Sequence, residues 1–315
     1  MKILTKIAMI VPLIALGIFV IMKTQNKNNK VKIGIIQIAE HEALDKARQG
    51  FIDEINRLGY DADFDVQVAG GDLSNCVSIS NKFVNDKKDL ILAISTPAAQ
   101  AAVNCINDIP ILFTAVSDPV SCGLVKSIEN PGKNATGTSD LTPVENQIKL
   151  LKKIVPNCKK VGILYCSSEA NSKSQANLAS EECKKLGMDS KYYTVSNSGE
   201  IQQVVENMVK SVDAIFVPTD NLIVSCMPAV SKIANDNKVP IICSESGSVK
   251  NGALATYAMD YVELGRITAR QAKKIIEKPS LIKTLPVEYI SDLKLFINYD
   301  VAKKIGITIP EELRQ

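Results

Sequence analysis

One turn from a strand into a helix constrains this chain more than any other stretch, because the same pattern recurs along the sequence. Residues 90–94 are five apolar residues, which is typical of a buried parallel strand. Ser95 and Thr96 follow directly, and Pro97 suits the first position of a helix with Thr96 as its N-cap. Such a turn directs backbone N–H groups and two hydroxyls at one point. It therefore predicts either an ordinary helix cap or an anion site.

The alternation of strands and helices occurs twice, with a boundary expected around residues 139–142. We predict strands at 31–38, 64–69, 90–94 and 111–116 in the first half, and at 160–166, 191–195, 214–217 and 239–243 in the second. Amphipathic or apolar helical segments separate them, as in residues 42–58. The pattern predicts an α/β protein with two doubly wound parallel-sheet lobes, each covered by helices on both faces.

Small hydroxyl or acidic residues stand at the carboxyl ends of the predicted strands. In open parallel sheets, ligands bind beyond these strand ends. Two lobes that face each other would therefore line a cleft with hydroxyls, helix N-termini and carboxylates, which suits a small zwitterion. The residues at these ends are Ser95 and Thr96; Thr114, Ser117 and Asp118; Ser167, Ser168 and Glu169; Thr219, Asp220 and Asn221; and Ser244 and Glu245.

The first 30 residues differ in composition from the rest of the chain. Lys2 and Lys6 precede an apolar run from residue 7 to residue 22, and a lysine- and asparagine-rich segment follows it. This order is typical of a signal peptide or an N-terminal membrane anchor, and we expect an uncleaved anchor with the remainder exported. The five lysines of this segment leave 32 basic against 34 acidic residues, a net charge of −2, which argues against a nucleic-acid partner.

The sequence carries no recognisable catalytic or metal-binding motif. Its eight cysteines form no CxxC pair and no spacing with histidine that is typical of metal sites, so we expect small buried thiols, no metal and no cofactor. The single histidine, His41, follows the first strand between Glu40 and Glu42, where a structural or ligand-lining role is expected rather than catalysis. An enzyme would need a site of unrecognised type.

Several runs of residues together resemble the tryptophan/tyrosine substrate-binding proteins of ABC importers, a branch of the type I periplasmic-binding fold. The similarity covers essentially residues 31–310. The runs are Gln37-x-x-Glu40-His41-x-Ala43-Leu44-Asp45, residues 94–100 (ISTPAAQ), 111–119 (ILFTAVSDP), 139–145 (SDLTPVE), 167–172 (SSEANS), 217–221 (VPTDN), 252–257 (GALATY) and Asp260-Tyr261-x-Glu263-Leu264-Gly265.

The resemblance implies two lobes joined by three hinge crossings, with the ligand bound between them. The expected division is residues 31–140 with about 260–288 in lobe 1, and 141–259 with about 290–315 in lobe 2. Asp140 would brace the hinge. The chain departs from the family pattern at Gly247, where an acid is expected after Glu245, and in lacking a lipobox cysteine near residue 23.

The resemblance also implies roles for individual residues in binding an amino acid, with aromatic ones favoured. Ser95, Thr96 and Thr114 would hold the α-carboxylate, although Thr96 and Thr219 could instead only cap helices. Glu245 or Asp260 would take the α-ammonium. The wall from the second lobe would be completed by Ser168, Asn171, Thr219 and Asp220. Candidate stacking partners for the side chain, each of which could equally belong to the core, are Phe113, Tyr165 and Tyr257.

The resulting hypothesis is an extracytoplasmic, monomeric receptor that closes on an amino acid and delivers it to an ABC permease. Closure would be a hinge motion driven by contacts from both lobes. A sensory ectodomain that serves a membrane signalling partner is the alternative, since the same fold performs both tasks. An enzyme is a third hypothesis, which turnover of a bound ligand would reveal.

Overall fold

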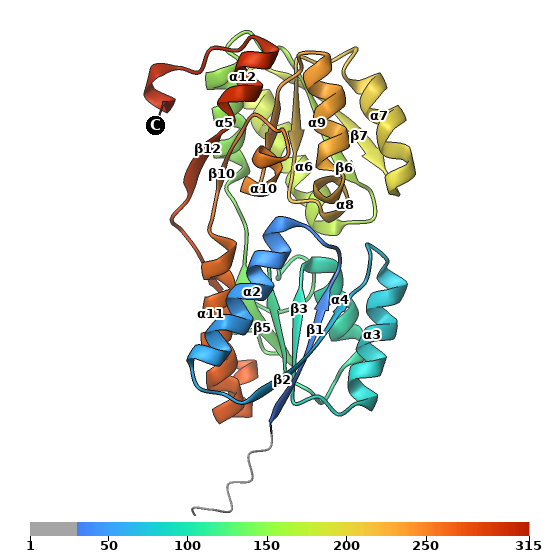
Figure 1. The fold of residues 1–315 in the computed structure, drawn as a ribbon, viewed down its shortest axis with the longest axis vertical. Coiled ribbons are helices and arrows are strands. Elements are labelled where there is room, and N and C mark those ends of the chain that lie inside the picture. Colours follow the sequence, from blue (N-terminus) through green and yellow to red (C-terminus); the bar gives the residue numbers. More distant parts are fainter. Residues whose placement is uncertain (1–29, 315) are drawn as a thin grey trace, which may run out of the picture.

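The computed structural model describes residues 30–314, which form two lobes stacked end to end (Figure 1). Each lobe contains one six-stranded sheet, and the strand orders are β11-β5-β4-β3-β1-β2 and β12-β10-β9-β8-β6-β7. The predicted α/β architecture with two doubly wound lobes is confirmed. The segment that we expected to anchor the chain, residues 1–30, lies almost entirely outside the described residues.

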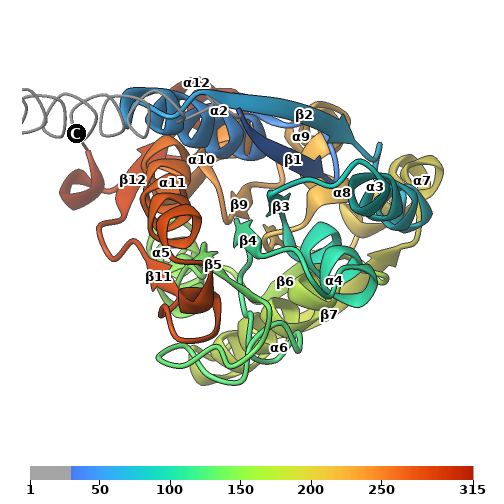
Figure 2. The same ribbon diagram turned by 90° about the horizontal axis from the view of Figure 1, so that it is seen from below.

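The first lobe has helices on both faces of its sheet. Helices α2 and α11 pack together on one face, whereas α3 and α4 cover the other (Figure 2). Its elements are β1 (Val31–Gln37), α2 (Glu42–Arg57), β2 (Ala62–Val68), α3 (Leu73–Asn85), β3 (Leu90–Ile94), α4 (Thr96–Cys105), β4 (Ile111–Thr114), β5 (Ala135–Ser139), α11 (Tyr261–Glu277) and β11 (Glu288–Tyr289).

The second lobe repeats the architecture, with one strand added in the opposite direction. Strand β12 pairs antiparallel with β10 at the sheet edge, so this sheet is mixed rather than purely parallel as predicted. The elements are α5 (Val144–Ile154), β6 (Lys160–Cys166), α6 (Ala170–Lys185), β7 (Asp189–Val195), α7 (Ile201–Met208), β8 (Ala214–Val217), α8 (Asn221–Ser225), α9 (Met227–Asp236), β9 (Ile241–Cys243), α10 (Ser246–Lys250), β10 (Ala255–Ala258), β12 (Lys294–Ile297) and α12 (Tyr299–Ile305).

Apolar side chains from the strands and from the covering helices form the cores. In the second lobe two separate clusters lie on the two faces of the sheet, one beneath α5, α6 and α12 and the other beneath α7, α8 and α9. The strand pattern explains this arrangement, because β8 is buried on both faces and reads as a continuous apolar run. Among the described residues, no helix combines the length and the apolar character that crossing a membrane requires.

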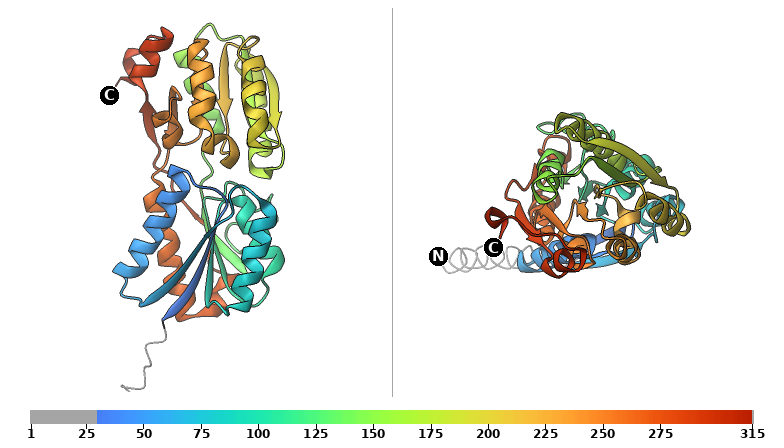
Figure 3. Two further views of the ribbon diagram at one scale, coloured as in Figure 1. Left: turned by 45° about the vertical axis from the view of Figure 1, so that its right-hand side comes forward. Right: turned by 90° about the horizontal axis from the view of Figure 1, so that it is seen from above.

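The chain passes between the lobes three times, as Figures 1 and 3 show. It leaves the first sheet after β5, returns from β10 directly into α11, and crosses again between β11 and β12. Both lobes are therefore completed by segments from the last third of the chain. This topology places the three crossings side by side at one edge of the molecule, which is the arrangement that a hinge requires.

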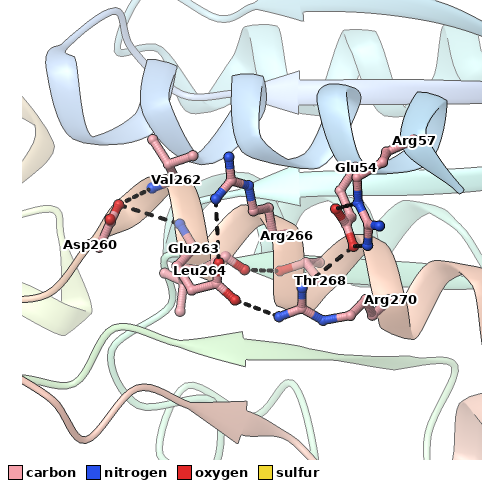
Figure 4. Close-up of polar contacts among 9 residues, drawn as sticks. All are labelled: Glu54, Arg57, Asp260, Val262, Glu263, Leu264, Arg266, Thr268 and Arg270. Atoms are coloured by element: carbon pink, nitrogen blue, oxygen red, sulfur yellow. Dashed lines mark hydrogen bonds and ion pairs between the residues drawn. The ribbon is translucent and has the colours of Figure 1, made fainter.

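The two glycines where α2 and α11 cross allow an unusually close helix contact. A Cβ atom at Gly265 would lie 2.0 Å from the carbonyl oxygen of Ala47, and one at Gly50 would lie 2.1 Å from that of Val262. Beside this contact the buried carboxylate of Glu54 accepts hydrogen bonds from Arg57, at 2.6 and 2.7 Å, and from Arg270 on α11 (Figure 4). Backbone proximity and this ion pair fix α11 onto α2.

Strand order creates a topological switch point in each sheet. In the first lobe β1 lies between β2 and β3, and in the second β6 lies between β7 and β8, so the connections from each central strand run in opposite directions. A crevice opens at the carboxyl ends of the strands at such a point, and ligands of open α/β sheets bind there. Both crevices face the boundary between the lobes.

Candidate functional site

A small cavity lies between the lobes where the two switch points meet. It measures about 10 Å³, which is room for a single water molecule. Admission of a larger guest therefore requires the lobes to move apart. We call this space the central cavity. It is lined by His41, Ala43, Leu44, Ala115, Asp140, Asn171, Thr219, Asp220, Asn221, Val224, Glu245 and Tyr261.

A wider groove continues from the central cavity toward one side of the molecule. It measures about 390 Å³ and shares Asn221 with the cavity. Apolar side chains from both lobes line much of this mouth groove, among them Ile38 and Pro97 from the first lobe and Leu222 from the second. The groove is the space into which a bound molecule could extend from the polar centre.

His41 bridges the two lobes. It precedes α2, and its Nε2 lies 3.3 Å from Oδ1 of Asn221 at the start of α8. Its other ring nitrogen, Nδ1, is buried without a hydrogen-bond partner. Burial lowers the pKa of His41 from 6.5 to about 4, so the ring is neutral at physiological pH.

The carboxyl ends of β3 and β4 carry backbone strain. Ser95 has φ 94° and ψ 160°, and Ala115 has φ 55°, although neither is glycine. Such conformations cost on the order of 1–3 kcal/mol each and are concentrated at functional sites. The strained Ser95 is the N-cap of α4, yet its buried hydroxyl has no hydrogen-bond partner.

In the second lobe one buried carboxyl group organises the cavity wall. Glu169 accepts hydrogen bonds from the backbone N–H of Asn221 at 3.1 Å and of Leu222 at 3.0 Å. It also accepts one from Nδ2 of Asn221, at 2.6 Å. Burial, and then the neighbouring Asp220 carboxylate, raise the pKa of Glu169. These hydrogen bonds connect the loop that follows β6 to the loop that follows β8.

The segment from Thr219 to Asn221 contains the N-cap of α8 and a polar side chain without a hydrogen-bond partner. Asp220 caps α8 by accepting from the N–H of Ile223 at 2.8 Å, and it also accepts from the N–H of Cys166 at 2.6 Å. The alternative in which Thr219 caps this helix is wrong, because Asp220 is its N-cap. The Thr219 hydroxyl is instead buried without a partner, and so is Oδ1 of Asn171, whose amide donates to the Thr219 carbonyl at 2.8 Å.

Asp140 connects two of the crossings. It follows β5, and its carboxylate accepts from Oγ of Ser117 at 2.9 Å and from the hydroxyl of Tyr261, the first residue of α11, at 2.9 Å. Burial raises the pKa of Asp140 despite these bonds. Tyr261 is the aromatic residue of the central cavity, and sequence reasoning did not select it.

Glu245 and Gly247 lie where the lobes touch near α10. Glu245 caps this helix by accepting from the N–H groups of Gly247 at 2.6 Å and Ser248 at 2.5 Å, and burial raises its pKa. A Cβ atom at Gly247 would lie 3.0 Å from Cβ of Glu42 on α2. Glu42 also pairs with Lys250 across the boundary, at 2.5 Å. The departure from the family pattern at Gly247 thus permits close contact of the lobes.

Six predicted site residues lie outside the lining of the central cavity, and Ser95 is one of them. Thr96 is the first residue of α4 rather than its N-cap, because Ser95 takes that position. The Thr114 hydroxyl accepts from Thr138 within a core cluster with Thr268, at 3.0 Å. Asp118 closes a turn by accepting a hydrogen bond from the N–H group of Ser121. The Ser168 side chain contacts Sγ of Cys166 and lines the mouth groove. Asp260 caps α11 (Figure 4).

The three candidate stacking residues are likewise not in the cavity. Phe113 belongs to the core of the first lobe and Tyr165 to that of the second, where its ring makes an edge contact with Tyr192. Tyr257 lines a groove at the back of the hinge. Because β4 is buried along its whole length, neither its residue pattern nor a position next to the strand end reveals which way the Thr114 side chain points.

The described part of the chain has no grouping of side chains suited to a metal ion. The eight cysteines are all free thiols, and five of them are buried. Their burial raises the pKa of those at positions 76, 158 and 183 to about 11 or 12, which makes them unreactive. The thiols therefore act as small core residues.

Comparison with known proteins places the chain in a family. Residues 32–315 match the model of the ABC transporter substrate binding proteins. The chain belongs to this family. It is a substrate-binding protein rather than an enzyme, and proteins of this kind work outside the cytoplasm beside an ABC permease. The predicted resemblance is confirmed.

The relatives carry names that refer to aromatic amino acids. The tyrosine-binding protein of Clostridioides difficile (strain R20291) is 46% identical over 289 residues, which cover 90% of this chain and 83% of that protein. The structure of an ABC domain in complex with L-Trp from Streptococcus pneumoniae is 35% identical, with a TM-score of 0.87 and coverage of 90% of this chain and 97% of that one.

A third comparison concerns the arrangement of the lobes. The ligand-free, open structure of a Clostridium difficile substrate binding protein with adhesive properties is 45% identical and covers 89% of this chain and 96% of that one, but its TM-score is only 0.67. This open structure is more similar in sequence than the L-Trp complex, yet it superimposes less well on the chain. The lobes of this substrate-binding protein are therefore arranged differently from the open structure, in agreement with the direct contacts His41–Asn221 and Glu42–Lys250.

Proposed function

We propose that this substrate-binding protein captures an aromatic amino acid between its lobes and delivers it to a membrane permease. The support comes from a relative named for tyrosine binding and a similar structure that contains L-Trp. The observation that carries the proposal is a set of buried, unpartnered polar atoms in the lining of the central cavity: Nδ1 of His41, Oδ1 of Asn171 and Oγ1 of Thr219. Oγ of Ser95, at the carboxyl end of β3, is a fourth buried atom without a partner. Such atoms are costly unless a ligand satisfies them.

The central cavity and the mouth groove suit different parts of the ligand. The polar atoms of the cavity suit the α-amino and α-carboxyl groups, and the strained Ser95 with the start of α4 suits the carboxylate. The aromatic side chain would extend into the mouth groove, where Ile38, Pro97 and Leu222 offer apolar contact. Thr219 and Asp220 complete the wall from the second lobe, and Glu245 supplies negative charge beside the cavity.

Closure would bring two bodies together around this site. We take them to be residues 31–140 with about 260–288, and 141–259 with about 290–315, with Asp140 as the brace of the hinge. The Asp140–Tyr261 bond supports this role because it joins two crossings. The apolar run of residues 7–22 would tether the protein to the outer face of the membrane, although it falls outside the described residues.

A screen of the twenty amino acids by thermal unfolding tests the proposed function. A ligand at 100 times its Kd stabilises the native state by about 2.7 kcal/mol, so tyrosine, tryptophan or phenylalanine should raise Tm by several degrees. Aliphatic and charged amino acids serve as the controls. A flat profile for all aromatic amino acids at millimolar concentration would rule the proposal out.

Replacement of the strained serine should separate stability from binding. We expect Ser95→Gly to raise the free energy of unfolding by about 1 kcal/mol, because glycine adopts φ 94° without strain. The same change should weaken amino-acid binding about tenfold, because the hydroxyl is lost. The matched control is Lys87→Gly, at an exposed position outside the cavity and the groove, which relieves similar strain at φ 51° and should stabilise without reducing affinity. Calorimetric titration and urea unfolding measure both effects, and equal affinities in the two variants would contradict the role of Ser95.

A further inference from the structure

The orientation of the Asn221 amide determines which nitrogen of His41 carries the proton. Each oxygen of Glu169 accepts a hydrogen bond from a backbone N–H group, that of Asn221 on Oε2 and that of Leu222 on Oε1. In the structure Nδ2 of Asn221 faces Glu169, at 2.6 Å, and Oδ1 of Asn221 faces His41. An oxygen acceptor 3.3 Å from Nε2 places the proton on Nε2.

The remaining nitrogen of His41 is consequently a bare acceptor. Nδ1 carries a lone pair, it is buried, and no described residue satisfies it. The depressed pKa of His41 keeps the ring neutral, so this lone pair persists across the physiological pH range. A neutral imidazole in this tautomer can only accept a hydrogen bond from whatever enters the cavity.

Glu169 orients a second amide in the same way. Nδ2 of Asn171 donates to the Thr219 carbonyl at 2.8 Å and approaches Oε2 of Glu169 at 3.4 Å, which leaves Oδ1 of Asn171 as another buried acceptor without a partner. His41 and Asn171 come from different lobes and line the same cavity of about 10 Å³. Two acceptors without partners, and the unpartnered Thr219 hydroxyl, thus belong to residues that line one narrow cavity.

The carboxylates that we first expected to bind the ammonium are occupied. Asp260 lies outside the cavity lining and accepts from two N–H groups of α11, and Glu245 accepts from two N–H groups of α10. Asp140 is engaged by Ser117 and Tyr261. The acceptors in the cavity lining that have no partner at all are neutral ones, Nδ1 of His41 and Oδ1 of Asn171.

We propose that Nδ1 of His41 and Oδ1 of Asn171 form the pocket for the ligand's ammonium group, with Glu169 as the residue that positions both. An ammonium group carries three N–H donors on one atom and can satisfy several acceptors that converge on one point, which a phenol or indole with a single donor cannot. The proposal rests on the proposed function, since it assigns the amine end of the amino acid. Because the two acceptors belong to opposite lobes, the ammonium group also holds the lobes together.

Paired ligands test this assignment by calorimetric titration of the full chain. Tyrosine is compared with 3-(4-hydroxyphenyl)propanoate, which lacks only the amine. We expect His41→Phe and Asn171→Leu each to weaken tyrosine binding about tenfold to a hundredfold, and to change binding of the amine-free analogue by less than about threefold. Asn171→Leu leaves the Thr219 carbonyl bonded to Ser172, at 3.0 Å, so the wall is retained.

A control variant separates amine recognition from general loss of closure. Glu42→Gln weakens the interlobe contact with Lys250 without touching the cavity, so it should affect both ligands by the same small factor. If His41→Phe and Asn171→Leu also weaken both ligands equally, these residues only hold the lobes together and the ammonium pocket is refuted.

The protonation of His41 can also be measured without any ligand. If the wild-type protein binds no aromatic amino acid, only the proposed function fails, and this measurement still tests the assignment of Nδ1 as an acceptor. The chain contains one histidine, so ¹⁵N labelling of histidine in the untagged protein gives signals from His41 only. We expect the Nε2–H tautomer with an unprotonated Nδ1, unchanged from pH 8 down to about pH 5. A proton on Nδ1, or titration near pH 6.5, overturns the assignment.

Discussion

Gly247→Leu should weaken amino-acid binding about tenfold to a hundredfold while leaving both lobes folded. A Cβ atom at this position would lie 3.0 Å from Cβ of Glu42 and 2.7 Å from Oε2 of Glu245. Cβ of Glu42 is fixed to the backbone of α2 and cannot move without the helix, so the bulk of leucine opposes closure. Overpacking of this kind costs about 1–3 kcal/mol. The contact with Glu42 exists only in the closed state, whereas Glu245 belongs to the same lobe as Gly247 and is met in both states. Calorimetric titration with tyrosine or tryptophan measures the loss.

Two further variants distinguish steric obstruction from loss of charge at this contact. Lys250→Met removes the ion pair with Glu42 but adds no bulk, and an exposed pair is worth at most about 1 kcal/mol, so its effect should be less than about fivefold. Combining Gly247→Leu with Glu42→Gly should restore much of the affinity, because it removes the opposing Cβ. Wild-type affinity in Gly247→Leu would show that the lobes close without this contact.

Gly265→Ala should lower the free energy of unfolding by about 3 kcal/mol, although alanine is the better helix former. Propensity alone favours alanine by about 1 kcal/mol within a helix. Here the new Cβ would lie 2.0 Å from the carbonyl oxygen of Ala47, and neither partner is a flexible side chain. The helices α2 and α11 would have to separate, which loosens the core that they share.

Urea denaturation of the wild type and the variant measures this effect. Lys274→Ala, at an exposed position on the same helix, serves as the control and should change stability by no more than about 0.5 kcal/mol. Gly50→Ala should behave like Gly265→Ala, since its Cβ would lie 2.1 Å from the Val262 carbonyl. Stabilisation by either glycine substitution would mean that the helices pack less closely than described.

The alternation of apolar strands with amphipathic helices predicted most of the fold. Period and turn signals along 90–100 identified β3 and α4 to within a residue, because a buried parallel strand has few alternative interpretations. The antiparallel direction of β12 was not predicted, since strand direction depends on where the chain returns rather than on the residues of the strand. Long-range pairing is not encoded in local pattern.

The candidate site was predicted less well because strand ends do not specify side-chain direction. Thr114 and Ala115 are neighbours, yet the threonine points into the core and the alanine lines the cavity. The positive φ of Ser95 has no local signature, as serine rarely adopts it. Asn221 and Tyr261 owe their roles to partners about 180 and 120 residues away in the sequence, which no local pattern contains.

The pairing of α2 with α11 has a consequence for biosynthesis. Helix α2 ends at residue 57, but its partner begins only at residue 261. At about 5–20 residues per second, a ribosome needs on the order of 10–40 s to supply the missing helix. The part of the α2 surface that α11 covers stays exposed for that whole interval. Nascent chains of this protein should therefore depend on a chaperone until nearly the entire polypeptide has been made.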